Sequence, residues 1–110
     1  MAHGIPESDW KLLRQLHPLA LDRYCRRILQ EIERLATDTK KNSHQRYLEI
    51  HKLVEKKDRE LGRAFDGLRR STALSQLAII YSYGVITEEE FMRFSPESRE
   101  TISFLSTPTA

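Results

Sequence analysis

The stretch that decides the fold runs from Ser43 to Leu68, SHQRYLEIHKLVEKKDRELGRAFDGL. Its apolar residues recur at steps of three and four, which places them along one side of a helix. Lys57 is the one polar break in this stripe, and the other sides carry Lys, Arg, Glu and Asp. We therefore predict a long central helix that packs against an apolar partner along its length. The stripe consists of Tyr47, Ile50, Val54, Leu61, Ala64 and Leu68.

Two helices are predicted before the central one. Ser8 or Asp9 is the expected N-cap of a short first helix, and Pro18 is expected to end or kink that helix at His17. A second helix is predicted from residue 19 to about residue 37. Its apolar face is formed by Leu21, Tyr24, Cys25, Ile28, Ile32, Leu35 and Ala36.

The central helix is bounded by two polar segments. Residues 37–43 form a polar loop, in which Asn42 or Ser43 is the expected cap. Gly67 and the polar residues after it predict a break, with Ser71 or Thr72 capping a new helix. The alternative is one continuous helix that rotates its buried face.

The last third of the chain predicts short, well-capped helices. Residues 73–80 (ALSQLAII) are apolar on nearly every side, so we expect this to be the most buried segment. Gly84 is a helix-ending residue with positive φ, and Thr87 with Glu90 predicts a capping box. Ser95 is predicted to cap a last helix that reaches about residue 104.

Composition supports an all-α protein, a small helical bundle of four to six helices with one long central helix. The 110 residues include 39% hydrophobic residues, 31% charged residues and only four glycines. This balance excludes a disordered chain, and the single Cys25 excludes an internal disulfide framework. No apolar run is long enough to cross a bilayer, and we see no signal peptide, so we expect a cytoplasmic protein. We predict a single domain, 1–110, with frayed tails at 1–7 and 106–110.

The charge distribution suggests one possible function. The formal net charge is +2, but residues 40–70 carry +5 and residues 71–110 carry −3. A basic helical face could contact phosphates, which gives a nucleic-acid-associated protein as the alternative reading. The acidic residues interleaved with the basic ones favour a solvated face instead. The candidate basic face consists of Lys52, Lys56, Lys57, Arg59, Arg63 and Arg70.

The apolar C-terminal half suggests the favoured function, a non-enzymatic protein–protein interaction or adaptor module that forms a homodimer. Aromatic residues and methionine, which are enriched at interface cores, follow the ALSQLAII segment. The alternative is that these residues form only the core of the monomer. The candidate interface consists of Leu74, Leu77, Ile80, Tyr81 and Phe91.

Catalysis and metal binding have the weakest support. No glycine-rich phosphate loop, no nucleophile motif and no cysteine beside a base is found. His44, His51 and Glu55 could share one side of the central helix, but bundle metal sites usually use Glu-x-x-His pairs, which are missing here. We therefore predict no catalytic residues, no cofactor and no metal site.

Overall fold

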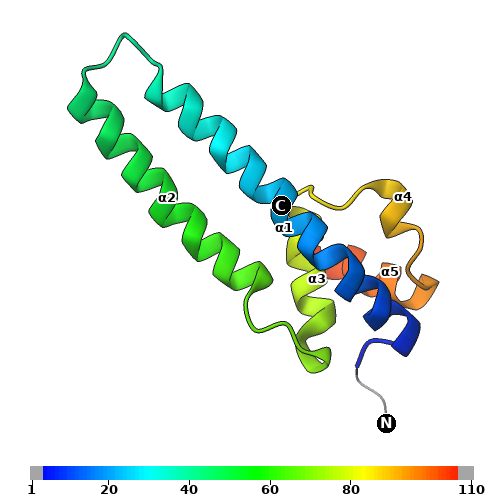
Figure 1. The fold of residues 1–110 in the computed structure, drawn as a ribbon. Helices are drawn as coiled ribbons and strands as arrows, with labels where there is room; N and C mark the ends of the chain where they lie inside the picture. Colours follow the sequence, from blue (N-terminus) through cyan, green and yellow to red (C-terminus); the bar gives the residue numbers. More distant parts are fainter. Residues whose placement is uncertain (1–3, 107–110) are drawn as a thin grey trace.

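The protein is all-α, as predicted. A computed structural model describes residues 4–106, and this part of the chain contains no strand. Its helices are α1 (Glu7–Ala36), α2 (Ser43–Phe65), the short 3₁₀ helix η1 (Arg70–Thr72), α3 (Ala73–Ser82), α4 (Glu88–Phe91) and α5 (Pro96–Ser106), shown in Figure 1.

The prediction of two helices before α2 is wrong. Helix α1 is continuous over 30 residues, with Pro18 inside it. Proline removes one backbone hydrogen bond, the one to the carbonyl of Arg14, and that loss is cheapest where water replaces the missing donor. Both Pro18 and Arg14 are exposed. Next to the proline, His17 hydrogen-bonds the Phe65 carbonyl through Nε2 at 3.0 Å, which ties this turn to the end of α2.

The start of α1 also differs from the prediction. Its N-cap is Pro6, which makes no side-chain capping bond, and Ser8 and Asp9 lie inside the first turn. Asp9 is not a cap but a buried residue, 2% exposed. The predicted frayed tail 1–7 is too long as well, because Ile5 is buried in the core and Glu7 begins the helix.

Helix α2 forms largely as predicted. Asn42 and Gln45 make a reciprocal capping box at its start. The helix ends at Phe65, and Gly67 adopts a φ of +62°, so the break predicted at this glycine is confirmed. The longest helix, however, is α1 rather than the central one.

The C-terminal turns follow their local signals. Gly84 has a φ of +74°, and Thr87 and Glu90 form the predicted capping box of α4. Ser95 accepts a hydrogen bond from the Ser98 N–H at 3.3 Å at the start of α5, as expected of a cap. Helix α5 extends to Ser106, two residues beyond the predicted end, and the rest of the predicted frayed tail lies outside the described residues.

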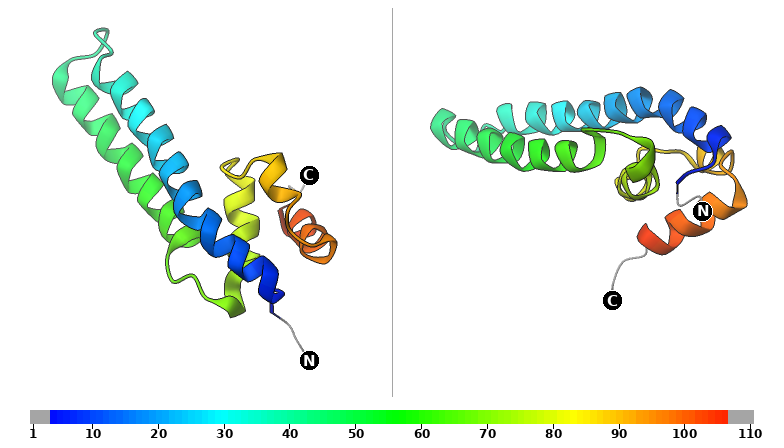
Figure 2. Two further views of the ribbon diagram at one scale, coloured as in Figure 1. Left: turned by 45° about the vertical axis from the view of Figure 1, so that its right-hand side comes forward. Right: turned by 90° about the horizontal axis from the view of Figure 1, so that it is seen from below.

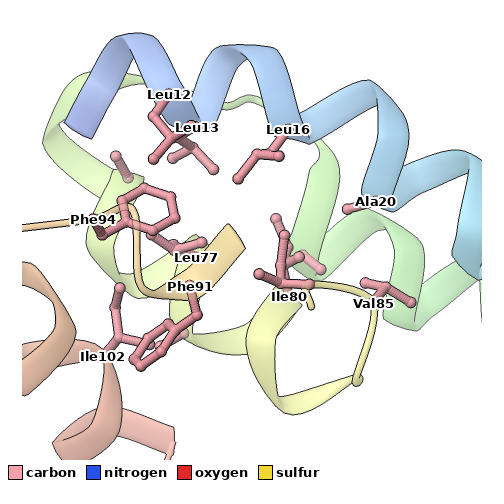
Figure 3. Close-up of a cluster of buried hydrophobic side chains, with 14 of the residues drawn as sticks. Leu12, Leu13, Leu16, Ala20, Leu77, Ile80, Val85, Phe91, Phe94 and Ile102 are labelled. Carbon is pink, nitrogen blue, oxygen red and sulfur yellow. The ribbon is translucent and has the colours of Figure 1, made fainter. Parts of the chain in front are cut away.

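The core lies at one end of the molecule, where α3 is enclosed by the other helices. Residues Ala73, Leu77, Ala78 and Ile80 are at most 3% exposed, which confirms that ALSQLAII is deeply buried. The enclosing elements belong to the same chain, since α3 packs against α1, α2 and α5. Figure 3 shows side chains of α1 meeting those of α3 and of the α4–α5 region. We call this part of the protein the head.

The remaining halves of α1 and α2 project from the head as an antiparallel pair, residues 25–63, which we call the hairpin (Figures 1 and 2). The molecule measures 57 × 29 × 23 Å, with a radius of gyration of 16.7 Å. A compact chain of this length has a radius of gyration of about 13 Å. The excess is the hairpin, which no third helix covers.

Candidate functional site

The hairpin has no buried residue at all between Cys25 and Arg63. Two helices alone can shield only the narrow seam where they meet, so apolar side chains beside that seam stay in contact with water. In this hairpin they include Leu29, 64% exposed, and Tyr47, also 64% exposed. A face of this kind is typical of a surface that binds another molecule.

Two of the exposed apolar side chains, Leu29 of α1 and Val54 of α2, lie on the same face of the hairpin. There α1 and α2 border a shallow hollow of about 250 Å³. We call this the apolar face; the hollow is lined by Cys25, Ile28, Leu29, Ile32, Val54, Lys57, Asp58 and Leu61.

Helical spacing explains why these residues share a face. In α1, Cys25, Leu29 and Ile32 follow one another at steps of four and three, which keeps them on one side of the helix. Leu29 was not predicted to belong to the apolar face of this helix. The sequence does contain a signal for Leu29, because it lies four residues after Cys25 and three before Ile32. It therefore widens the apolar face of this helix beyond what a single partner helix can cover.

A polar and aromatic cluster lies where the hairpin joins the head, beside the end of α3. Tyr24 stacks on Tyr83 at 4.9 Å between ring centroids and donates a short hydrogen bond to the Glu60 carboxylate. Lys57 completes the group, 3.2 Å from Glu60 and above the Tyr24 ring. These contacts join both helices of the hairpin to α3, so this cluster positions the hairpin on the head.

Electrostatics in this cluster follows from its contacts. Burial, reinforced by the hydrogen bond to the Glu60 carboxylate, raises the pKa of Tyr24. That same hydrogen bond, helped by Lys57, lowers the pKa of Glu60. Tyr24 therefore remains a neutral donor and Glu60 a charged acceptor near neutral pH, which suits a structural role.

Two arginines of α1 hold the turn that follows α3. Arg27 donates to the carbonyls of Tyr83 and Gly84 at 2.8 and 2.6 Å. Arg23 donates to the Val85 carbonyl at 3.1 Å and forms a bidentate pair with the Glu90 carboxylate, at 2.7 and 2.9 Å. These bonds fix the turn against α1, on the side away from the apolar face.

The predicted interface residues lie in the head. Leu77 and Ile80 are completely buried, and Phe91 is 7% exposed, all within the core of the same chain. Leu74 and Tyr81 are half-buried, and Tyr81 stacks on Phe91 at 4.3 Å. The first three side chains are thus not accessible to a partner in this conformation.

The structure divides the predicted basic face into two groups. Lys57 points to Tyr24 and Glu60, as described above, and Arg70 binds the Ile5 carbonyl and the Glu7 carboxylate. The four others are exposed along α2: Lys52, Lys56, Arg59 and Arg63.

The three residues weighed as metal ligands are exposed on α2. His51 lies 3.1 Å from the Glu55 carboxylate, whereas His44 takes no part in that pair. Within residues 4–106, no group of three or more His, Cys, Asp or Glu side chains is placed to hold a metal ion.

Comparisons with known proteins give no relative. No protein-family model, no curated protein and no solved structure matches the chain. Among the described helices, none is both long enough and apolar enough to span a bilayer.

Proposed function

We propose that the protein is a non-enzymatic interaction module that forms a homodimer through the apolar face of its hairpin. The observation that carries this proposal is the complete lack of buried residues between Cys25 and Arg63, in helices that nevertheless carry exposed Leu29, Tyr47 and Val54. Covering these side chains removes apolar surface from water, which is favourable by roughly 25 cal/mol per Å².

A second copy of the chain is the occupant that fits best. The apolar face is two helices wide, so a single partner helix would fill the hollow and leave the outer apolar side chains wet. A second hairpin has the same width and length, and a two-fold axis would place the two faces against each other as a four-helix bundle.

The face is small. From Tyr47 to Leu61 the rise of α2 is about 21 Å, and two packed helices are about 20 Å wide. The footprint is therefore about 400 Å² per copy, whereas a standard stable interface buries about 800 Å² of accessible surface per partner. We therefore expect a weak, reversible dimer rather than a permanent one.

The test is the mass of the protein in solution as a function of concentration, by sedimentation equilibrium. Wild type should pass from monomer to dimer as concentration rises. Leu29→Glu should remain monomeric and as stable as wild type at low concentration, because this side chain is 64% exposed in the monomer.

Leu48→Glu is the matched control. It makes the same chemical change in the same hairpin, at a side chain that is 41% exposed but does not line the hollow. This variant should dimerise like wild type. A wild-type chain that stays monomeric into the millimolar range, or equal losses from both substitutions, would contradict the proposal.

A further inference from the structure

The side of α2 turned away from the apolar face carries a row of four cations. Lys52, Lys56, Arg59 and Arg63 follow one another at steps of four, three and four residues. At 100° per residue these positions fall within about 60° of each other, and they span about 16 Å of helix. All four side chains are exposed. We call this row the basic stripe.

The acidic residues interleaved in this sequence do not neutralise the stripe. Lysines offset two of them: Glu49 pairs with Lys41 at 2.6 Å and Glu60 with Lys57 at 3.2 Å. Glu55 lies 3.1 Å from His51 rather than against a cation of the stripe. Asp58 borders the hollow of the apolar face. In the folded chain these acids are thus directed to residues outside the stripe.

None of the four cations of the stripe forms an ion pair within 4 Å with any residue from 4 to 106. A hollow of about 370 Å³ is lined by Lys56, Arg59, Arg63 and Glu60. Glu60 is the only acid at its edge, and its charge is offset by Lys57. The stripe thus presents positive charge to solvent over three turns.

The residues around the stripe favour a nucleic-acid phosphate backbone over an acidic protein as its ligand. A protein partner needs an apolar interface core, from which lysine is depleted. The one exposed large apolar side chain between residues 52 and 63 is Val54, which lies on the opposite side of α2. A phosphate backbone requires only Lys and Arg at the surface. The stripe consists of surface Lys and Arg without exposed apolar neighbours, as a phosphate-binding surface requires.

We propose that Lys52, Lys56, Arg59 and Arg63 bind the phosphate backbone of a nucleic-acid duplex without reading its sequence. This site is independent of the apolar face, because the two surfaces lie on opposite sides of α2. In the dimer proposed above, both stripes would remain open to solvent.

The test is the fluorescence anisotropy of a labelled DNA duplex, titrated with the full chain at several salt concentrations. If all four cations contact phosphates, the slope of log affinity against log salt is about −3.6. This slope corresponds to a loss of affinity of roughly 150-fold between 50 and 200 mM salt. Lys56→Glu with Arg59→Glu should abolish measurable binding, and the milder Lys56→Gln with Arg59→Gln should reduce the slope by about 2.

The control is Lys11→Glu with Arg93→Glu, two exposed cations of the head that also lack an ion pair among the described residues. It changes net charge as much as the charge-reversed pair and should leave the slope near the wild-type value. Circular dichroism melting should give every variant the wild-type transition.

Three results would overturn the proposal. The first is absence of duplex binding even at low salt, and the second is an equal loss in the head control, which would indicate a net-charge effect. The third is a directly measured affinity for polyglutamate, at matched charge concentration, that exceeds the affinity for the duplex, which would make the stripe a site for acidic protein segments.

Discussion

Replacing Asp9 by alanine should destabilise the head more than any other exchange of a single polar side chain. The Asp9 carboxylate is buried at the start of α1 and accepts three hydrogen bonds from the start of α5. The Ser95 N–H donates to Oδ1 at 3.0 Å, and the hydroxyls of Ser95 and Ser98 donate to Oδ2, each at 2.6 Å. One side chain thereby joins two segments 86 residues apart in sequence.

The magnitude follows from these three bonds. A hydrogen bond to a charged group contributes about 1.5–3 kcal/mol, but the two hydroxyls can rotate to other acceptors after truncation. The Ser95 N–H has no such freedom and would lose its partner at a half-buried position. We therefore expect Asp9→Ala to lower the free energy of unfolding by about 3–5 kcal/mol, the loss of about two such hydrogen bonds and a large part of the 5–15 kcal/mol of a typical domain.

Asp9→Asn should be milder, about 1–2 kcal/mol. The amide oxygen can still accept from the Ser95 N–H, while the amide nitrogen donates to hydroxyls that have turned. Asp22→Ala is the control in the same helix, because this carboxylate is 71% exposed and pairs only with Arg26 at the surface. Its cost should be below about 0.5 kcal/mol.

Urea unfolding followed by circular dichroism would measure all three variants, with the slope m unchanged if only the native state is affected. In a thermal scan, Asp9→Ala should lower Tm by about 12–20 °C. A loss below about 1 kcal/mol, or equal losses for Asp9→Ala and Asp22→Ala, would refute the view that this carboxylate fastens α5 to α1.

Three further predictions concern the turns and the aromatic cluster. The hydrogen bonds from Arg23 lower the pKa of Glu90 to about 2. The stability contributed by this pair is therefore complete above the unfolded pKa near 4.5 and is lost as pH falls toward 2. Glu90→Gln should cost about 1–2 kcal/mol in urea unfolding at pH 7 and progressively less toward pH 2, and a cost that does not change with pH would contradict this. Gly84→Ala should lower the free energy of unfolding by about 1 kcal/mol, because the φ of this residue is +74°. Gly62→Ala, inside α2, should leave the free energy of unfolding nearly unchanged or raise it. Equal Tm values for the two variants would contradict this reasoning. Tyr24→Phe should raise the pKa of Glu60, measured by NMR titration of its side chain, since the hydrogen bond from Tyr24 is the largest cause of its low value; an unchanged titration would show that Lys57 alone holds the charge.

Features of the fold that depend on neighbouring residues could be predicted from the sequence. The cap at Asn42 and the box of Thr87 with Glu90 each arise from a side chain and a backbone group within three residues. The break at Gly67 arises from the positive φ that glycine adopts without strain. Such interactions form in almost any context, so their signals are reliable.

Features that depend on distant residues could not be predicted. Ser8 and Asp9 have the composition of a cap, but Asp9 is buried because of two serines near the other end of the chain. Pro18 has the composition of a helix end, yet α1 continues through it, since tertiary contacts on both sides outweigh one lost hydrogen bond.

The two proposed surfaces show the same division. Helical spacing places Lys52, Lys56, Arg59 and Arg63 on one side of α2. The predicted basic face also includes Lys57 and Arg70, which bind Glu60 and Glu7 instead. Whether interleaved acids cancel the charge of the basic stripe depends on where those acids find partners, and Lys41 and Tyr24 reach Glu49 and Glu60 only in the folded chain. The apolar face became visible only when the structure showed which apolar residues of the hairpin no third helix covers.

The uncovered hairpin also implies that resistance to opening is distributed unevenly along the chain. Amides of α3, surrounded by packed helices, should exchange with solvent deuterium only through global unfolding. Amides near the tip, around residues 36–46, should exchange through local separation of two helices that few buried contacts hold together. A molecule that binds across both helices of the hairpin must suppress that separation. Slower deuterium exchange of the tip amides would therefore report binding, even if the exchange of the head amides stays unchanged.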